Sequence, residues 1–193
     1  AAIEKALRCG IVCSFETPFQ SRVAAALAEM VPCVDMVRFT CSGTEATMHA
    51  IRLAREYTGR DKIIKFDGHF HGLHDYLMWN YGGWKSGEPP GVESGDTLPP
   101  VVQSGGIPAG ISQYVLVLPC NDLDAVRRTL QTYGHEIAAV ILEPIHYNAG
   151  CIVPPKEYLH GLRELTREYG VVLIFDEILS AFLTGPGCAQ SYF

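Results

Sequence analysis

Short apolar runs alternate with amphipathic stretches along most of the chain, and this alternation restricts the fold more than any other feature. Five runs rich in apolar or β-branched residues are typical of strands: Val37–Thr40, Ile63–Phe66, Tyr114–Leu118, Ala138–Leu142 and Val171–Phe175. Four stretches have helical periodicity, with Gly59, Gly134 and Gly170 placed as stops: Ser21–Met30, Thr44–Tyr57, Leu123–Tyr133 and Lys156–Tyr169. The pattern predicts an α/β fold with a mostly parallel sheet and helices on both faces.

The start of the helix predicted over 44–57 combines a capping signal with an anion site. Ser42, followed three residues later by Glu45, fits a capping box. Gly43 and Thr44 then fall in the first turn, where backbone N–H groups lack a helical partner and the helix dipole adds partial positive charge. We expect this turn to favour a dianionic phosphate, with the Thr44 hydroxyl as a further donor. For the motif alone, an ordinary capped helix without a ligand is the favoured alternative.

The last predicted strand ends in two carboxylates, Asp176 and Glu177. An unpaired charge is costly at the end of a buried strand, so Asp176 needs a partner. A metal ion, as at the acidic strand of P-loop ATPases, is disfavoured because the chain has no GxxxxGK[ST] motif. The protonated ring nitrogen of a cofactor is a second candidate, since an Asp would stabilise the charged ring and strengthen it as an electron sink. The third is an Asp that caps the next helix or turn.

Three histidines lie within six positions between Gly68 and Asp75. As zinc ligands, His69, His71 and His74 would have Asp75 in support. In a cofactor site, Phe70 would instead stack on an aromatic ring and His71 would contact the ring substituents. A solvated turn rich in histidine is the remaining alternative. Because no further ligand cluster follows, zinc is the minority interpretation and we expect no metal ion.

Another strand leads into Glu143-Pro144 and then into a polar turn that contains Asn148. Glu143 would steer a substrate or a ring hydroxyl, and Asn148 offers a neutral donor for a phenolate oxygen. A strand-end Glu before a proline-containing turn is the simpler alternative. Since ligands collect at the carboxyl ends of parallel strands, we expect these residues to lie at the same edge as Asp176.

Composition restricts the partner and the compartment. The net charge of −6 and a pI near 5.6 argue against nucleic acid and anionic membranes, and no segment has the apolar length of a membrane span. A small-molecule ligand is therefore expected. The seven cysteines contain no CxxC pair, which predicts reduced thiols and a cytoplasmic location. The Gly- and Pro-rich stretch from Tyr81 to Ser112 predicts a functional or mobile loop.

Four motifs occur in an order that resembles the class III pyridoxal-phosphate-dependent aminotransferases: residues 42–46, 68–72, 143–148 and 175–177. Residues 37–60 and 64–75 most resemble the glutamate-1-semialdehyde aminomutase branch. The resemblance covers nearly the whole chain but only part of the family fold. It implies that residues 1–193 form a partial large domain of fold type I, incomplete at both ends. The amino-terminal segment, the catalytic-lysine region and the small carboxy-terminal domain would be absent. The full-length protein would be a homodimer.

The resemblance also implies that pyridoxal 5′-phosphate is the cofactor. Its phosphate would rest on the backbone of Gly43 and Thr44, and its ring would lie between Phe70 and Ile178. The residues implied to contact the cofactor are Ser42, Gly43, Thr44, Phe70, His71, Asn148, Asp176 and Ile178.

The catalytic residues implied by the resemblance are Asp176, Glu143 and His71. Asp176 would pair with the ring nitrogen, Glu143 would lie near the ring hydroxyl and the reacting amino group together with Asn148, and His71 would lie beside the ring. The Schiff-base lysine of the family has no counterpart, because none of the lysines lies in a Gly-Lys motif: Lys5, Lys62, Lys65, Lys85 and Lys156.

The implied reaction moves an amino group between an amine donor and an aldehyde or keto acceptor. In an aminomutase, both amino groups belong to one substrate. Two departures leave the substrate open: His146-Tyr147 replaces small or amide residues of the family, and Leu183 stands where Arg is frequent. The alternatives are a non-catalytic binding module or degenerate paralogue, and a zinc hydrolase that uses the three histidines.

Overall fold

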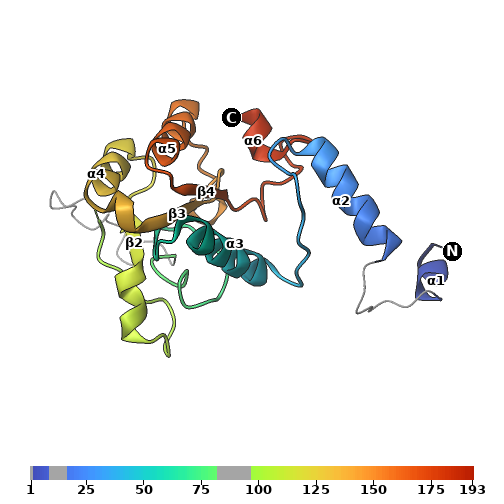
Figure 1. The fold of residues 1–193 in the computed structure, drawn as a ribbon, viewed down its shortest axis with the longest axis horizontal. Coiled ribbons are helices and arrows are strands. Elements are labelled where there is room, and N and C mark those ends of the chain that lie inside the picture. The colour runs from blue at the N-terminus through green and yellow to red at the C-terminus, as the bar shows by residue number, and fades with distance from the viewer. Residues whose placement is uncertain (1, 9–16, 82–96) are drawn as a thin grey trace. The chain divides into compact units, whose positions relative to one another are not determined.

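The computed structural model describes residues 2–8, 17–81 and 97–193, which fall into two compact units, 1–38 and 39–193 (Figure 1). The first unit contains α1 (Ala2–Leu7) and α2 (Pro18–Met30). A capping box starts α2: Thr17 Oγ1 accepts from the Gln20 N–H, and Gln20 Oε1 accepts from the Thr17 N–H. The predicted helix over 21–30 is thus confirmed, with an earlier start.

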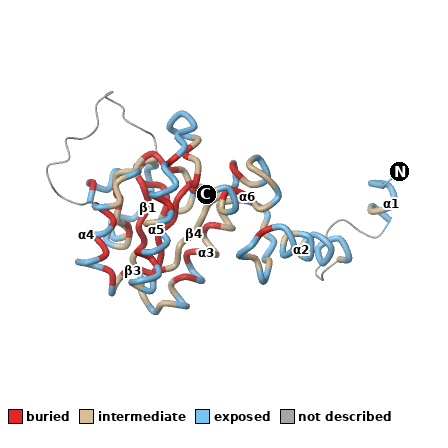
Figure 2. The backbone as a smooth tube through the Cα atoms, turned by 90° about the horizontal axis from the view of Figure 1, so that it is seen from above, coloured by how far each residue is buried: buried red, intermediate tan, exposed pale blue. Residues whose placement is uncertain are grey.

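The second unit is built on a four-stranded parallel sheet in the described residues. The strands are β1 (Lys62–Phe66), β2 (Val115–Leu118), β3 (Ile137–Leu142) and β4 (Val172–Phe175), in the order β2-β1-β3-β4. Figure 2 shows buried chain concentrated in β1 and β3, the two central strands. Apolar side chains on both faces of these strands explain why the sheet lies between two layers of helices.

Helices cover both faces of the sheet (Figure 1). One face packs on α3 (Gly43–Thr58), with Ile63 and Ile141 in the shared core. The other face packs on α4 (Leu123–Tyr133) and α5 (Lys156–Glu168), with Ile64 and Val140 in the shared core. The remaining described helix of this unit is α6 (Cys188–Tyr192), and short 3₁₀ turns cover Ala109–Tyr114, Gly134–Glu136 and Tyr147–Ala149. The α/β fold with helices on both faces is confirmed.

The strand predicted over Val37–Thr40 is wrong, because these residues form no regular secondary structure. Arg38 is exposed in the middle of the run, and Phe39 is also largely exposed. The run therefore buries too little apolar surface to hold a position in the sheet. It leads instead straight to the start of α3.

The three predicted helix stops act in two different ways. Gly59 and Gly170 have φ of 67° and 62°, the left-handed conformation that glycine adopts without strain. Gly134 has φ −55° and the helix continues into a 3₁₀ turn. A Cβ at Gly134 would lie 2.6 Å from the Tyr169 ring, so close packing and not handedness requires glycine here.

The Gly- and Pro-rich stretch predicted as a loop lies partly outside the described residues, since 82–96 are not described. Its described remainder is tied to the sheet: Leu98 is buried and pairs with Val117 of β2, and Val102 pairs with Trp79. The described cysteines are free thiols. Within the described ranges, no helix is both long enough and apolar enough to cross a bilayer.

Candidate active site

The start of α3 leaves two backbone donors free. Ser42 Oγ accepts from the Glu45 N–H at 3.2 Å, and the Ser42 carbonyl accepts from the Ala46 N–H. Glu45 Oε2 accepts from the N–H of Cys41 at 2.7 Å, one residue before the cap, so the second bond of the predicted capping box is shifted. Within the described residues, no acceptor bonds the N–H groups of Gly43 and Thr44. These donors and the helix dipole favour an anion.

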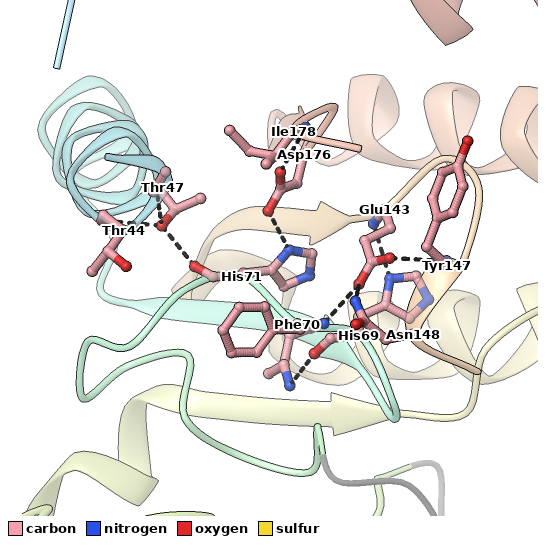
Figure 3. Close-up of polar contacts among 12 residues, drawn as sticks. Thr44, Thr47, His69, Phe70, His71, Glu143, Tyr147, Asn148, Asp176 and Ile178 are labelled. Carbon is pink, nitrogen blue, oxygen red and sulfur yellow. Dashed lines mark hydrogen bonds and ion pairs between the residues drawn. The ribbon is translucent and has the colours of Figure 1, made fainter. Parts of the chain in front are cut away.

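Asp176 follows β4 and meets His71 from the loop after β1 (Figure 3). Asp176 Oδ2 accepts from His71 Nδ1 at 2.8 Å, and Oδ1 accepts from the Ile178 N–H at 3.2 Å. The second bond is the turn-capping role that the sequence left open. Burial lowers the pKa of His71, although the hydrogen bond with Asp176 acts to raise it. A neutral imidazole that donates through Nδ1 keeps a lone pair on Nε2, which is buried and which no described residue bonds.

Glu143 lies at the end of β3 and collects three donors (Figure 3). Oε1 accepts from the Phe70 N–H at 2.7 Å and from Asn148 Nδ2 at 2.8 Å, while Oε2 accepts from the Tyr147 N–H at 3.1 Å. The residue is only 5 % exposed. Since protein donors engage both oxygens, this carboxylate holds Phe70 and Asn148 in place.

One cavity of about 320 Å³ joins these groups at the carboxyl ends of the strands. All the predicted site residues line it except Ser42, which caps α3 behind Gly43: Gly43, Thr44, Phe70, His71, Glu143, Asn148, Asp176 and Ile178. Sequence reasoning missed Ile145, Leu179 and Ser180 as lining residues and assigned no role to Tyr147. In the described part of the chain, no lysine or arginine lines the cavity. Two carboxylates, Asp176 and Glu143, therefore line it with no described lysine or arginine beside them.

Close contacts hold the loop that carries Phe70 and His71 against α3. Thr47 Oγ1 lies 2.8 Å from the His71 carbonyl, and Thr44 Oγ1 accepts from the Leu73 N–H at 3.1 Å. Thr47 was missed from the sequence, although its spacing to Ile51 and Ala54 on the predicted helix was a usable signal. Gly72 has φ 95°, and a Cβ there would lie 2.8 Å from the Thr44 Cα atom. Only glycine permits this approach.

We expect Gly72→Ala to weaken phosphate-ester binding by at least about ten-fold, because the new methyl group must push the loop away from the first turn of α3. Gly59→Ala is the matched control: Gly59 also has positive φ, but a Cβ there meets nothing within 4 Å. Both variants place a side chain at positive φ, 67° at Gly59 and 95° at Gly72, but only Gly72→Ala also meets the helix, and ligand titration measures the difference in affinity. Equal losses in the two variants would contradict the close-approach argument.

The three histidines do not form the zinc site that the sequence allowed. His69 Nδ1 accepts from the Glu143 N–H, His71 bonds Asp176, and His74 Nε2 lies 3.4 Å from Thr47 Oγ1. Each ring is thus directed to a different partner, and in the described part of the chain their ligand atoms do not converge. These three histidines therefore cannot serve together as the zinc ligands of the hydrolase alternative.

A different group, His69, Cys120 and His146, has ligand atoms within 4.8 Å of one another. Burial lowers the pKa of His69, so the ring is neutral, and Nδ1 is already an acceptor for the Glu143 N–H. The ring proton is therefore on Nε2, 3.3 Å from Cys120 Sγ. A metal would need a lone pair on Nε2, so His69 is not available as a ligand, and its ring is bonded to Cys120 instead.

Comparison with known proteins places this geometry in a family. The family model described as aminotransferase class-III matches residues 1–192. Glutamate-1-semialdehyde 2,1-aminomutase of Methanococcus maripaludis strain C5 is 44% identical over 192 residues, which are 100% of this chain and 42% of that protein. An omega-transaminase from Sphaerobacter thermophilus is 40% identical with a TM-score of 0.88, over 99% of this chain and 42% of that one.

A transaminase solved with PLP bound is 34% identical, with a TM-score of 0.86 over 99% of this chain and 42% of that one. These matches confirm the expected fold type I architecture. The chain spans about two fifths of the length of the relatives it matches. It belongs to the class III aminotransferase family.

Proposed function

We propose that the protein transfers amino groups with pyridoxal 5′-phosphate, as a class III transaminase or a glutamate-1-semialdehyde-type aminomutase. The observation that carries the proposal is a single cavity lined both by the first turn of α3, with its two free N–H groups, and by the carboxylate of Asp176. A phosphate ester on a cationic ring complements both features. We also propose that residues 1–193 are part of the large domain of this enzyme.

The residues present fit this cofactor. The side chain of Ile178 lies so near Gly43 that a Cβ there would lie 3.2 Å from it, so glycine at this position lets Ile178 pack closely over the first turn of α3. The buried Nε2 atom of His71 has no hydrogen-bond partner among the described residues, which leaves an acceptor for a ligand group. Phe70 offers an aromatic face in the same cavity.

Each residue has a separate task in the proposed reaction. When bound, the cofactor supplies an electron-accepting ring that stabilises negative charge at the substrate carbon. Gly43 and Thr44 bind the phosphate through backbone N–H groups. Asp176 keeps a proton on the ring nitrogen by favouring its charged form, and His71 orients that carboxylate through its Nδ1–H bond. Phe70 packs against the ring.

Substrate contacts and proton transfer require further groups. Glu143 orients the amide of Asn148 toward the reacting end of the cavity. Neither described lysine of β1 is placed for proton transfer, because Lys65 does not line the cavity and Lys62 is paired with Glu136. The proposed substrates are an amine or amino acid and an aldehyde or keto acid. A homodimer is proposed from the exposed apolar run after β4, which includes Phe182 and Leu183.

The test is a titration of the full-length protein with pyridoxal phosphate, followed by absorbance, with pyridoxal as the matched ligand that lacks phosphate. We expect saturable binding of pyridoxal phosphate at least about 100-fold tighter than that of pyridoxal, since the α3 site recognises the anion. Loaded protein should then release a carbonyl product from an amine donor. Equal affinity for the two ligands would refute the proposal, and binding without turnover would support the non-catalytic module.

A further inference from the structure

One peptide group behind the cavity lies between a buried amine and a buried carboxylate. The carbonyl of His69 accepts from Lys65 Nζ at 3.0 Å. The N–H of the same peptide group, that of Phe70, donates to Glu143 Oε1 at 2.7 Å (Figure 3). The negative end of the peptide dipole thus faces the amine, and the positive end faces the carboxylate. Both ends of the peptide plane are fixed, and with them the direction in which the Phe70 side chain leaves the backbone.

Lys65 also closes the loop that carries Phe70. Its amine donates to the Trp79 carbonyl, at the far end of the loop from His69. A backbone bond from the Gly68 N–H to the Asn80 carbonyl at 2.6 Å lies beside this link. The Lys65 side chain and this backbone bond therefore both join the beginning of the loop over 67–81 to its end.

Core packing alone does not require a lysine at this position. Lys65 lies inside β1 and is completely buried, on the face of the sheet that packs on α3. Burial lowers its pKa to about 7, whereas the charges of Asp67 and Glu143 act to raise it. A β-branched apolar residue would avoid this desolvation cost. The amine is retained despite this cost, and one of its partners, the His69 carbonyl, shares a peptide group with Phe70, which lines the cavity.

We propose that Lys65 is a positioning residue of this site: acting through the His69–Phe70 peptide group on Glu143, it fixes Phe70 and Asn148 along the cavity wall. The inference deepens the proposed function and rests on it only for the identity of the ligand. Lys65 does not line the cavity, so it acts on the ligand solely through these neighbours.

The test replaces the amine by an apolar chain of similar length, Lys65→Met, in the full-length protein. Lys62→Met is the matched control, because Lys62 lies three residues earlier on the same strand and pairs with exposed Glu136. Without pyridoxal phosphate, we expect the Phe70 amide to exchange hydrogen at least about ten-fold faster in Lys65→Met, since its peptide group loses one of two anchors. Exchange in β3 should not change, and Lys62→Met should match the wild type.

A double-mutant cycle tests whether the lysine acts through the carboxylate. Lys65→Met, Glu143→Gln and the double variant are titrated with pyridoxal phosphate, and we expect Lys65→Met alone to weaken binding about ten-fold. The double variant should be less impaired than the product of the single effects, because both residues hold the same peptide group. If the losses of affinity in the two single variants multiply in the double variant, Lys65 and Glu143 act independently and the proposal is overturned.

Further outcomes separate positioning from bulk stability. If Lys65→Met does not fold, Lys65→Gln, which keeps an N–H₂ donor, replaces it in both experiments. Uniformly faster exchange across β1 and β3, unchanged exchange at Phe70, or failure of both variants to fold would each overturn the positioning role. If wild-type protein does not bind pyridoxal phosphate, the proposed function fails, whereas the exchange result at Phe70 still decides the role of Lys65.

Discussion

We expect Asp176→Asn to lower kcat/KM for amino transfer by about a thousand-fold. A neutral amide cannot stabilise a proton on the ring nitrogen, and each unit by which that pKa falls removes about 1.4 kcal/mol of preference for the charged ring. The amide would also present an N–H₂ group or a weaker oxygen to His71 Nδ1, which now donates to a carboxylate at 2.8 Å. Steady-state kinetics of the full-length variant measure the effect.

The control for Asp176→Asn is the same substitution at Asp124, an exposed residue in the first turn of α4. Asp124→Asn should retain nearly full activity. A thermal unfolding curve for each variant separates loss of chemistry from loss of fold. If Asp176→Asn kept more than about a tenth of wild-type activity, charge at this position would not be required and the assignment of Asp176 to the ring nitrogen would be wrong.

Glu143→Gln should lower the free energy of unfolding by about 2–4 kcal/mol and weaken ligand binding. The carboxylate accepts three hydrogen bonds in a buried place, and glutamine must turn its N–H₂ group toward at least one of those donors. Removing an acceptor from a buried donor costs about 1–3 kcal/mol, and bonds to charged groups are the stronger ones. Chemical denaturation of the full-length protein measures the loss.

Glu136→Gln provides the comparison for Glu143→Gln. Glu136 lies just before β3 and forms a 2.8 Å ion pair with Lys62, but its side chain is 41 % exposed. Solvent compensates a lost surface pair, so this variant should unfold almost as the wild type does. A similar loss in the two variants would mean that the donors around Glu143 find other acceptors, and the carboxylate would then not organise the cavity wall.

The sheet was predictable because its strands are apolar on both faces. The runs 63–66, 114–118, 138–142 and 171–175 became β1 to β4 with shifts of at most one residue at each end. Strands buried from both sides carry this signal in their own composition, whatever their neighbours are. The run 37–40 looked similar, and Arg38 alone does not set it apart because 63–66 carries Lys65. β-Propensity in a short run says little about whether a partner strand is available.

The residues that line the cavity were predictable, but the hydrogen bonds between them were not. Motifs at strand ends indicated the place, because parallel strands bring their carboxyl ends together. The partners of His71 and Glu143 come from residues 105 and 73 positions away along the chain, at Asp176 and Phe70. Spacing within a motif cannot reveal such pairs. For the same reason, His69, His71 and His74 looked like one ligand set although tertiary contacts separate them.

Lys65 shows the limit of motif-based reasoning most clearly. It lies in the stretch 64–75 that resembles the aminomutase branch, but no motif gave it a role, and the sequence indicated only that it belongs to a strand. A lysine inside a buried strand breaks the local rule for core positions, and such breaks concentrate where function constrains the structure. The charged residue inside an apolar run was therefore a signal in the sequence. The partners of Lys65 could not be predicted from residue types, because they are two backbone carbonyls.

The pairing of β1 has a consequence for synthesis of the protein on the ribosome. Ile63 pairs with Val115 on one side and with Ala139 on the other, so this strand emerges long before either neighbour exists. At roughly 5–20 residues per second, the wait for the second neighbour lasts about 4–15 seconds. During that interval the nascent segment offers unpaired backbone N–H and C=O groups and apolar side chains to other chains and to chaperones. Translation speed between these strands should therefore influence how much of the protein is recovered from the soluble fraction.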